Sequence, residues 1–347
     1  MTARPPTGDS APDDENLDYL DAGLSDDFDD DAARTQALPP PPERGSRQSV
    51  DAAPSFAVIA GQPAPRDRSW TWPAINAVGL AVVVLVNFLA NALEFNGQST
   101  GDVVNRDPVP FQPAGWVFSI WGVIYTLLLL FVIYGFLPGG RRNVRLRRIS
   151  PLFLLSNVAN VTWIVLWHYE QFFASLVTIL VLLGSLLAIY IGLRIRNPLH
   201  RVGTARLPWY IRLMVWVPFS VYLGWVCVAT LSNVMVWLER SGWDGGPFSY
   251  NVWAMIFMAL GVVVAAAFAI TARDILIPLV FTVAYTGVAD QNWGEATSVS
   301  IVAIVFAVVC AALAALAWIL AFDRDTDRNP FSRKAAAGTP PPMTHVE

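Results

Sequence analysis

Eight long apolar segments constrain this chain more than any other feature of its sequence. A helix that crosses a hydrocarbon core about 30 Å thick needs roughly 20 mostly apolar residues, and each segment is near that length. The predicted spans are residues 74–93, 114–137, 150–167, 171–193, 212–237, 250–270, 274–290 and 297–321. With 54% hydrophobic and only 14% charged residues, the composition is also typical of a membrane protein. The sequence therefore predicts an all-α membrane protein.

The two ends of the chain differ in composition from this apolar body. Residues 1–68 are rich in Asp, Pro, Ser and Ala, and eleven Asp and Glu lie among the first 31 residues. Such segments bury too little apolar surface to fold, so we predict a disordered cytoplasmic tail there and a second one at 323–347. Between them we predict a five-helix transmembrane domain at 69–240 and three additional transmembrane helices at 241–322. One alternative is an interaction protein in which the acidic tail does the binding.

The charges of the loops predict how the helices are oriented in the membrane. Arginines cluster after the second span, from Arg141 to Arg148, and after the fourth, from Arg194 to Arg212, whereas the opposite loops are acidic or sparsely charged. Because cytoplasmic loops carry an excess of Lys and Arg, this alternation places both termini in the cytoplasm and requires an even number of crossings. We therefore expect an integral protein of a bacterial-type plasma membrane.

Several aromatic and amide side chains lie deeper in the spans than membrane anchoring requires. Trp121, Trp163 and Trp225 lie on three different helices, inside the aromatic belts that explain tryptophans at span ends. Asn157 and Asn160 are neighbours on one helix face, and both are expected to point inward because an amide facing lipid is costly. Packing and hydrogen bonds between helices are one explanation. The other is a polar-lined pocket whose flat indole walls suit a planar aromatic ligand.

Other chemistries find little support in the sequence. No Asp, Glu, Lys or Arg lies in the middle of a span, and Arg273 and Asp274 belong to a short loop, which argues against proton-coupled pumps and voltage sensors. No phosphate-binding loop of the form GxxxxGK[ST] occurs. His168, with Glu170 at the outer end of span three, is either a polar cap or a ligand of a haem iron.

The two cysteines, Cys227 and Cys310, both lie inside apolar runs. Cysteine in such a setting usually acts as a small hydrophobic residue. We therefore expect neither a disulfide nor a metal site from them.

Three of the spans carry motifs of a known family. Residues 111–125, FQPAGWVFSIWGVIY, resemble the second helix of the tryptophan-rich sensory protein or translocator protein (TspO/MBR) family. The residues that match this motif and two further family motifs on spans three and five are Pro113, Trp116, Phe118, Trp121, Tyr125, Asn160, Trp163, Tyr222, Leu223, Trp225, Val226, Ala229, Thr230 and Asn233. The positions that depart from the family pattern are Phe111, Ala114, Val221 and Val228. The resemblance covers residues 74 to about 240.

The resemblance implies a five-helix bundle that binds porphyrins, and in some members sterols, in a cavity capped by the loop between the first two helices. Here that loop would be residues 94–113, and spans six to eight would extend the usual domain. Family members are described as tetrapyrrole sensors, as transporters and as catalysts of light-dependent porphyrin breakdown. Two short sterol-recognition patterns also occur, at Leu187–Tyr190–Arg194 and Leu207–Tyr210–Arg212, although such patterns also mark an ordinary cytoplasmic interface.

Together, the residues and the resemblance predict a membrane protein that binds a planar hydrophobic ligand, which the family implies to be a porphyrin or haem. The expected ligand-binding residues are Trp116, Trp121, Tyr125, Asn157, Asn160, Trp163, Tyr222, Trp225 and Asn233. We rank a sensory or regulatory role above transport, and transport above enzymatic breakdown. No catalytic residue, metal site or required cofactor is expected. The expected partners are the small molecule and the lipid bilayer, without nucleic acid, and the sequence leaves open whether a homodimer forms.

Overall fold

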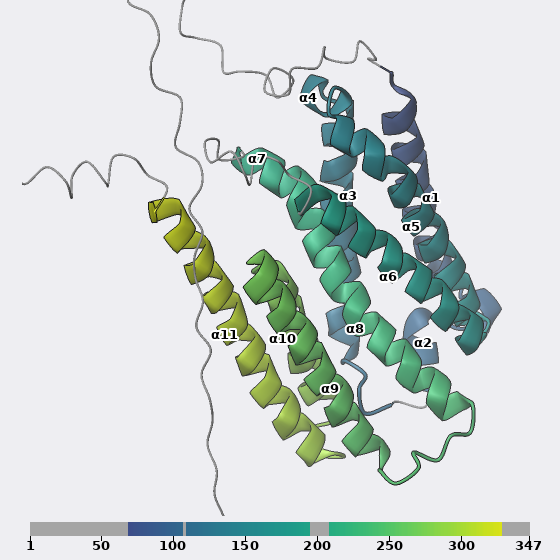
Figure 1. Ribbon diagram of the computed structural model, residues 1–347. Coiled ribbons are helices and arrows are strands. Elements are labelled where there is room, and N and C mark those ends of the chain that lie inside the picture. Colours follow the sequence, from purple (N-terminus) through teal and green to yellow (C-terminus); the bar gives the residue numbers. More distant parts are fainter. Residues whose placement is uncertain (1–68, 107–108, 195–207, 328–347) are drawn as a thin grey trace, which may run out of the picture. The chain divides into compact units, whose positions relative to one another are not determined.

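The computed structural model describes residues 69–106, 109–194 and 208–327, and within these ranges the chain is helical and has no strand (Figure 1). The elements are α1 (Thr71–Ala92), η2 (Phe95–Gly97), α2 (Thr100–Asn105), η3 (Gly115–Ser119), α3 (Ile120–Phe136), α4 (Pro138–Arg141), α5 (Val144–His168), α6 (Phe172–Arg194), α7 (Trp209–Ile211), η5 (Arg212–Trp216), α8 (Val217–Arg240), α9 (Tyr250–Ala267), η6 (Phe268–Ala272), α10 (Leu276–Gln291) and α11 (Thr297–Asp327). The tail predicted at 1–68, residues 328–347 of the second tail and Leu207 of the second sterol pattern lie outside the described residues.

Among the described residues, seven helical stretches are long and apolar enough to cross a membrane, which confirms the predicted all-α membrane fold. The remaining predicted span, α10, has only 16 residues. At 1.5 Å per residue it is about 24 Å long, shorter than a hydrocarbon core of roughly 30 Å. More than half of its residues are buried, and it packs against α8 and α11. Most residues of α10 are therefore in contact with other helices of the protein.

Two helices extend beyond the predicted boundaries. Helix α5 begins at Val144, six residues before the predicted start at 150, because Asn143 caps it. The side-chain oxygen of Asn143 accepts a hydrogen bond of 3.0 Å from the amide of Arg145. The arginines expected in a loop thus occupy the first turns of a helix. At the other end of the chain α11 continues to Asp327, so residues 323–327 are helical and not part of a disordered tail.

The second span begins one residue later than the predicted start at 114. Ala114 is extended, and its amide donates a hydrogen bond of 3.0 Å to the carbonyl oxygen of Gly287 on α10. Because this tertiary bond holds the backbone out of a helical conformation, the first helical residue is Gly115, and η3 forms the first turns before α3. The segment that leads into α3 is therefore fastened to α10.

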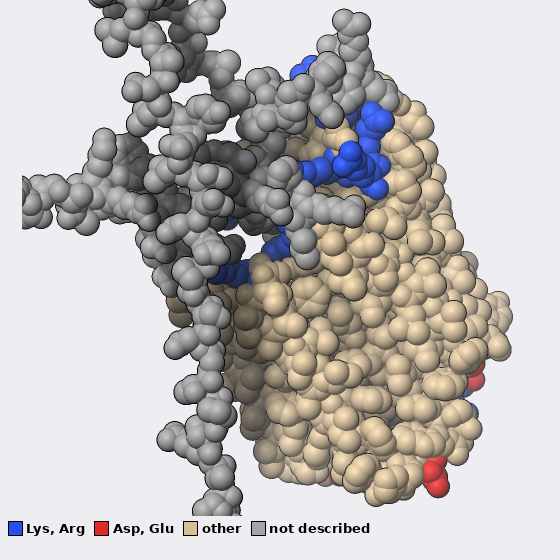
Figure 2. Space-filling view, in the orientation of Figure 1, with Lys and Arg blue, Asp and Glu red and all other residues tan. Residues whose placement is uncertain are grey.

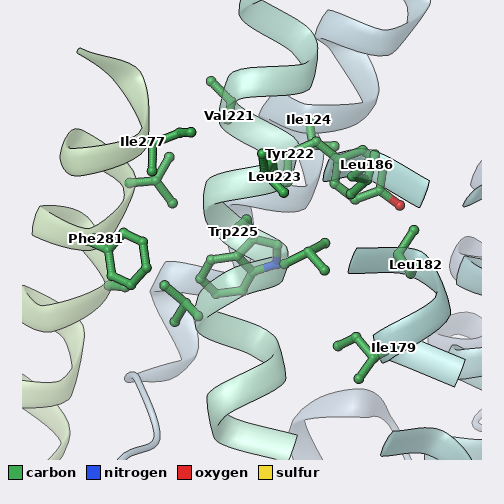
Figure 3. Packing of buried hydrophobic residues seen from close by; sticks show 14 of the residues in the cluster. Ile124, Ile179, Leu182, Leu186, Val221, Tyr222, Leu223, Trp225, Ile277 and Phe281 are labelled. Carbon is green, nitrogen blue, oxygen red and sulfur yellow. The ribbon is translucent and has the colours of Figure 1, made fainter. Parts of the chain in front are cut away.

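Helix α8 lies at the centre of the bundle (Figure 1). Its Tyr222 and Trp225 are among the largest fully buried side chains. Figure 3 shows the Trp225 indole between Phe281 of α10 on one side and Leu182 of α6 on the other. The first five and the last three predicted spans thus contribute to one hydrophobic core. The described residues all belong to one compact unit, and the predicted domain boundary at 240 stays a prediction.

Charged side chains gather at the two ends of the helices. In Figure 2 the basic residues lie at the end of the molecule where α4 and the start of α5 are found, whereas acidic atoms are visible at the opposite end. The basic residues of this part are Arg141, Arg142, Arg145, Arg147 and Arg148. The distribution agrees with the loop charges on which the predicted orientation depends, and the cytoplasmic location of the termini stays a prediction.

Candidate ligand-binding site

A cluster of aromatic rings centred on Trp121 brings together three of the motif-bearing helices. The ring centroid of Trp121 lies 5.7 Å from that of Tyr125, 5.8 Å from Trp163, 6.1 Å from Tyr222 and 6.2 Å from Trp225. These distances are those of stacked and edge-to-face aromatic pairs. The rings predicted to converge from separate helices therefore do so.

Helical periodicity explains why each element presents its residues to this cluster. On α3, Trp121 and Tyr125 are four residues apart and lie on the same face. On α5 the same spacing separates Trp163 from Trp167, whose rings stack at 6.1 Å. Trp167 was assigned to the aromatic belt by its position at the end of the span, although the four-residue spacing from Trp163 already placed it on the inner face.

The amides of the cluster are hydrogen-bonded between helices. Asn87 of α1 donates to the side-chain oxygen of Asn160 over 2.9 Å, and Asn160 donates to the hydroxyl of Tyr222 over 2.9 Å. The indole N–H of Trp163 donates to Asn233 over 3.3 Å. A chain of hydrogen bonds therefore connects α1, α5 and α8 through side chains that are mostly buried. These amides act as the interhelical bonds that were one of the two explanations for their presence.

The rings leave a small cavity between them, which we call the inner chamber. Its volume is about 30 Å³, room for roughly two water molecules. The residues that line it are Thr100, Gln112, Pro113, Phe118, Trp121, Trp163, Trp167, Trp225, Val228, Ala229, Ser232, Asn233 and Val236. The rings pack against each other, so the chamber is far smaller than a ligand with several fused rings. We expected the indoles to line a cavity large enough for a planar ring. The cavity between them is too small for one, so that expectation is corrected.

A much larger cavity, which we call the outer groove, lies next to the inner chamber. Its volume is about 720 Å³, within the range of roughly 300–1,000 Å³ that holds small organic ligands. The residues that line it are Val84, Asn87, Phe88, Asn91, Ala92, Thr100, Gly101, Gly115, Phe118, Trp121, Tyr125 and Ile164. The groove and the chamber share Thr100, Phe118 and Trp121. Trp121 therefore stands between the two cavities.

The outer groove lies where α1 and α3 diverge. At the basic end these helices are in contact, with the rings of Trp70 and Phe136 6.0 Å apart. Toward the other end, the α1 side chains Val84 and Phe88 line the groove and are 39% and 66% exposed. The groove therefore opens sideways between two helices, onto a surface that a bilayer would cover.

The loop between α1 and α3 covers the site at the end of the bundle opposite the basic residues. Gln98 donates hydrogen bonds to the carbonyl oxygen of His168 (2.7 Å) and to Glu170 (3.0 Å), and Arg106 forms an ion pair with Glu170. Hydrogen bonding by Gln98 and pairing with Arg106 hold the pKa of Glu170 below its ordinary value, despite partial burial, which acts in the opposite direction. The loop at 94–106 is thus attached to the end of α5, in the position expected for a cap over the ligand cavity.

His168 fastens this loop and does not present a free nitrogen. It is fully buried, and its Nδ1 lies 2.8 Å from the carbonyl oxygen of Ile164, which can only accept a hydrogen bond. Nδ1 therefore carries the proton, and Nε2 accepts from the hydroxyl of Thr100 over 3.3 Å. Both ring nitrogens have a hydrogen-bond partner, which favours the polar-cap alternative, and the haem-ligand alternative stays a prediction. Among the described residues, no group of three or more His, Cys, Asp or Glu could hold a metal ion.

Four predicted site residues line neither cavity: Trp116, Asn157, Asn160 and Tyr222. Trp116 is 51% exposed, and its indole N–H donates to Asp290 of α10 over 3.0 Å. Asn157 is buried against Gly79 of α1, where a Cβ atom would lie 2.7 Å from its amide nitrogen. Asn157 therefore belongs to a close contact between α1 and α5. Gln112, by contrast, lines the inner chamber although it is not among the matched positions of the motif at 111–125.

The comparison with protein families covers most of the chain. A family described as TSPO-like protein matches residues 73–317. No curated protein and no solved structure matches the chain. The matched region begins at α1 and reaches into α11, so it includes the helices beyond 240 that the motif resemblance left out. The chain belongs to the TSPO-like family.

Proposed function

We propose that this protein binds a planar hydrophobic ligand, a tetrapyrrole such as a porphyrin or haem, and acts as a sensory or regulatory membrane protein. The observation that carries the proposal is the outer groove of about 720 Å³ between α1 and α3. Its volume suits a ligand of this size, and Phe118, Trp121 and Tyr125 supply flat aromatic walls. Membership of the TSPO-like family supports the same ligand class.

The groove combines the two kinds of surface that such a ligand requires. Its aromatic rings offer stacking or edge contacts to a macrocycle, and Asn87, Asn91 and Thr100 offer hydrogen-bonding groups to polar substituents. The exposed Val84 and Phe88 at its rim give a hydrophobic molecule a route from the lipid phase. The loop at 94–106 closes the site from the outer end of the bundle.

A sensory role needs a path by which an occupied groove affects the rest of the protein. Asn87 lines the groove and donates to Asn160, which in turn donates to Tyr222 of α8. Helix α8 packs against α10, where Gly224 allows close approach to Val280. A ligand that takes over the hydrogen bonds of Asn87 would therefore change the contacts of α8. The residues lining both cavities lie in the half of the bundle away from the basic end, which favours binding over transport through the membrane.

The proposal is tested by titrating the detergent-purified full chain with protoporphyrin IX and with haem. Binding is followed by quenching of tryptophan fluorescence and by the porphyrin absorption band. We expect saturable binding that Trp121→Phe and Asn87→Leu each weaken about tenfold, and that the matched variant Trp318→Phe leaves unchanged because Trp318 is an exposed residue of α11. Binding that does not saturate, or equal affinity in all four proteins, would refute the proposal.

A further inference from the structure

We infer that the inner chamber is a subsite for a hydrogen-bond acceptor, which takes a carboxylate or carbonyl oxygen on a short arm of the bound ligand. This inference rests on the proposed function and adds the chemistry of one end of the ligand. Its basis is that three residues lining the chamber carry buried N–H groups that have no acceptor within the described part of the protein. The residues that carry them are Gln112, Trp167 and Trp225.

All three side chains are removed from solvent. Gln112 and Trp225 are each 2% exposed, and Trp167 is 5% exposed. An indole can donate a hydrogen bond and cannot accept one, so only an acceptor satisfies Trp167 and Trp225. A buried donor left without a partner has lost its hydrogen bonds to water and gained none from the protein, which is unfavourable. Three such donors at one cavity are therefore unfavourable unless an acceptor enters it.

The same cluster contains a donor that is satisfied, which makes the three others more informative. Trp163 lies four residues before Trp167 on α5, has the same 5% exposure and donates to Asn233. The protein thus supplies an acceptor for one indole of the chamber and none for its neighbour. Within this cluster the satisfied Trp163 thus differs from Trp167 and Trp225, and the buried Tyr125 hydroxyl, which borders the outer groove, is likewise without a partner.

The size and charge of the chamber define what it accepts. A volume of about 30 Å³ has room for two oxygen-sized atoms, as in one carboxylate, and excludes a ring. No Asp, Glu, Lys or Arg lines it, so the recognition is by neutral N–H groups. Such donors satisfy a carboxylate or a carbonyl and leave a purely hydrocarbon arm without partners.

The chamber is adjacent to the groove in which the proposed macrocycle lies. Thr100, Phe118 and Trp121 border both cavities, so a short substituent has to pass only these side chains to move from one to the other. The ligand class that follows is a planar hydrophobic molecule carrying at least one acceptor group on a flexible arm. A molecule of the same shape without such a group fills the groove and leaves the three donors unpaired.

Two porphyrins that differ in this respect test the inference. Protoporphyrin IX carries carboxylates on short arms, and etioporphyrin has only alkyl substituents. We expect the wild-type protein to bind protoporphyrin IX at least tenfold more tightly. Trp167→Phe and Gln112→Leu should each reduce that affinity about tenfold and leave etioporphyrin binding unchanged. Trp253→Phe is the matched control, because the indole N–H of Trp253 is bonded to Gly245 away from the chamber.

The outcomes separate the inference from the proposed function. Saturable binding of both porphyrins with equal affinity, unchanged in both variants, means that the chamber holds water only and overturns the inference while the proposed function stands. Binding of neither porphyrin overturns both. If the variants weaken both ligands equally, their role is structural and the inference fails. Infrared difference spectra give a second readout, because the carboxylate band of bound protoporphyrin IX should shift in Trp167→Phe.

Discussion

The aromatic cluster centred on Trp121 and the ionic network around Asp274 differ in how their buried polar groups are hydrogen-bonded. The network lies near the opposite end of α6, α8 and α10. Asp274 is 1% exposed and forms an ion pair of 2.8 Å with Arg194. Tyr190 and Ser220 donate to the same carboxylate oxygen over 2.9 and 2.8 Å, while the other oxygen accepts from the amides of Leu276 and Ile277. Both oxygens of Asp274 are thus satisfied by the protein itself.

The inner chamber lacks this completeness, since three of its donors have no acceptor within the described residues. A buried charge needs all its partners from the fold, because an unpaired one is strongly destabilising. A neutral N–H can be left for a ligand at a smaller penalty. The comparison therefore indicates that the ionic network holds helices together, whereas the inner chamber leaves donors open for the ligand that we propose.

Removing the charge of Asp274 should have the largest effect of the variants considered. Asp274→Ala leaves Arg194 partly buried without its carboxylate, and we expect a loss of about 3–5 kcal/mol in the free energy of unfolding. Chemical unfolding in detergent measures it, with Glu295→Ala as the control, since Glu295 is an exposed carboxylate outside this network. The double variant with Arg194→Leu and Asp274→Leu should recover much of the loss. A loss below 1 kcal/mol for Asp274→Ala would remove the contrast between the two regions.

A methyl group at Gly287 should displace the segment before α3 that lines the inner chamber. A Cβ atom there would lie 2.2 Å from Val117 and 3.2 Å from Pro113, so the segment before α3 must shift. We expect Gly287→Ala to lower the free energy of unfolding by about 1–3 kcal/mol and to weaken porphyrin binding. Gly122→Ala is the control, because a Cβ at Gly122 meets nothing within 4 Å. Unchanged affinity in Gly287→Ala would show that α10 does not shape the site.

Two tryptophans one helical turn apart on α5 test the difference between satisfied and unsatisfied donors. Trp163→Phe and Trp167→Phe remove similar volume from equally buried positions, but only the first removes a hydrogen bond and leaves Asn233 with one donor fewer. We expect Trp163→Phe to lower the free energy of unfolding by about 1 kcal/mol more than Trp167→Phe does. Equal losses, measured by unfolding without ligand, would mean that the Trp167 N–H has an acceptor in the protein.

Acid should weaken the attachment of the loop at 94–106 by a small amount. The pKa of Glu170 is lowered in the folded protein, so its contribution is present above the ordinary value of 4.5 and is lost as the pH falls through the lowered pKa. Because Glu170 is partly exposed, we expect less than about 1 kcal/mol. Porphyrin dissociation should become about twofold to threefold faster at acid pH.

The pKa of Asp102 in the same loop is also lowered, chiefly by the hydrogen bond from the Ser99 side chain, so a second carboxyl near this attachment is held in its charged form. Glu170→Gln separates them, because it should give fast dissociation already at neutral pH and remove most of the acceleration on acidification. Identical pH profiles in wild type and Glu170→Gln would assign the effect to another group.

Residue spacing within single helices predicts much of the candidate site. The rest depends on contacts between helices, which spacing does not predict. The three-residue step from Asn160 to Trp163 places both on one helix face, and the structure shows both turned inward. Trp116 has an equally good place in the motif, yet it faces α10 because Asp290 offers an acceptor 174 residues away. Gln112 carries no signal in the sequence, since its burial depends on where the segment before α3 is held.

The sequence by itself determined the helices, their inward-facing amides and the family motifs, because transfer of side chains to lipid and the 3.6-residue helical repeat act over short stretches of chain. Only the tertiary structure decided that the indoles pack on each other and leave about 30 Å³, while the larger space opens between α1 and α3. Likewise, only the fold brings Arg194 to Asp274, which the sequence placed in separate loops. A cavity or a buried ion pair depends on how helices distant in sequence approach each other, and residue spacing within one helix carries no record of that distance.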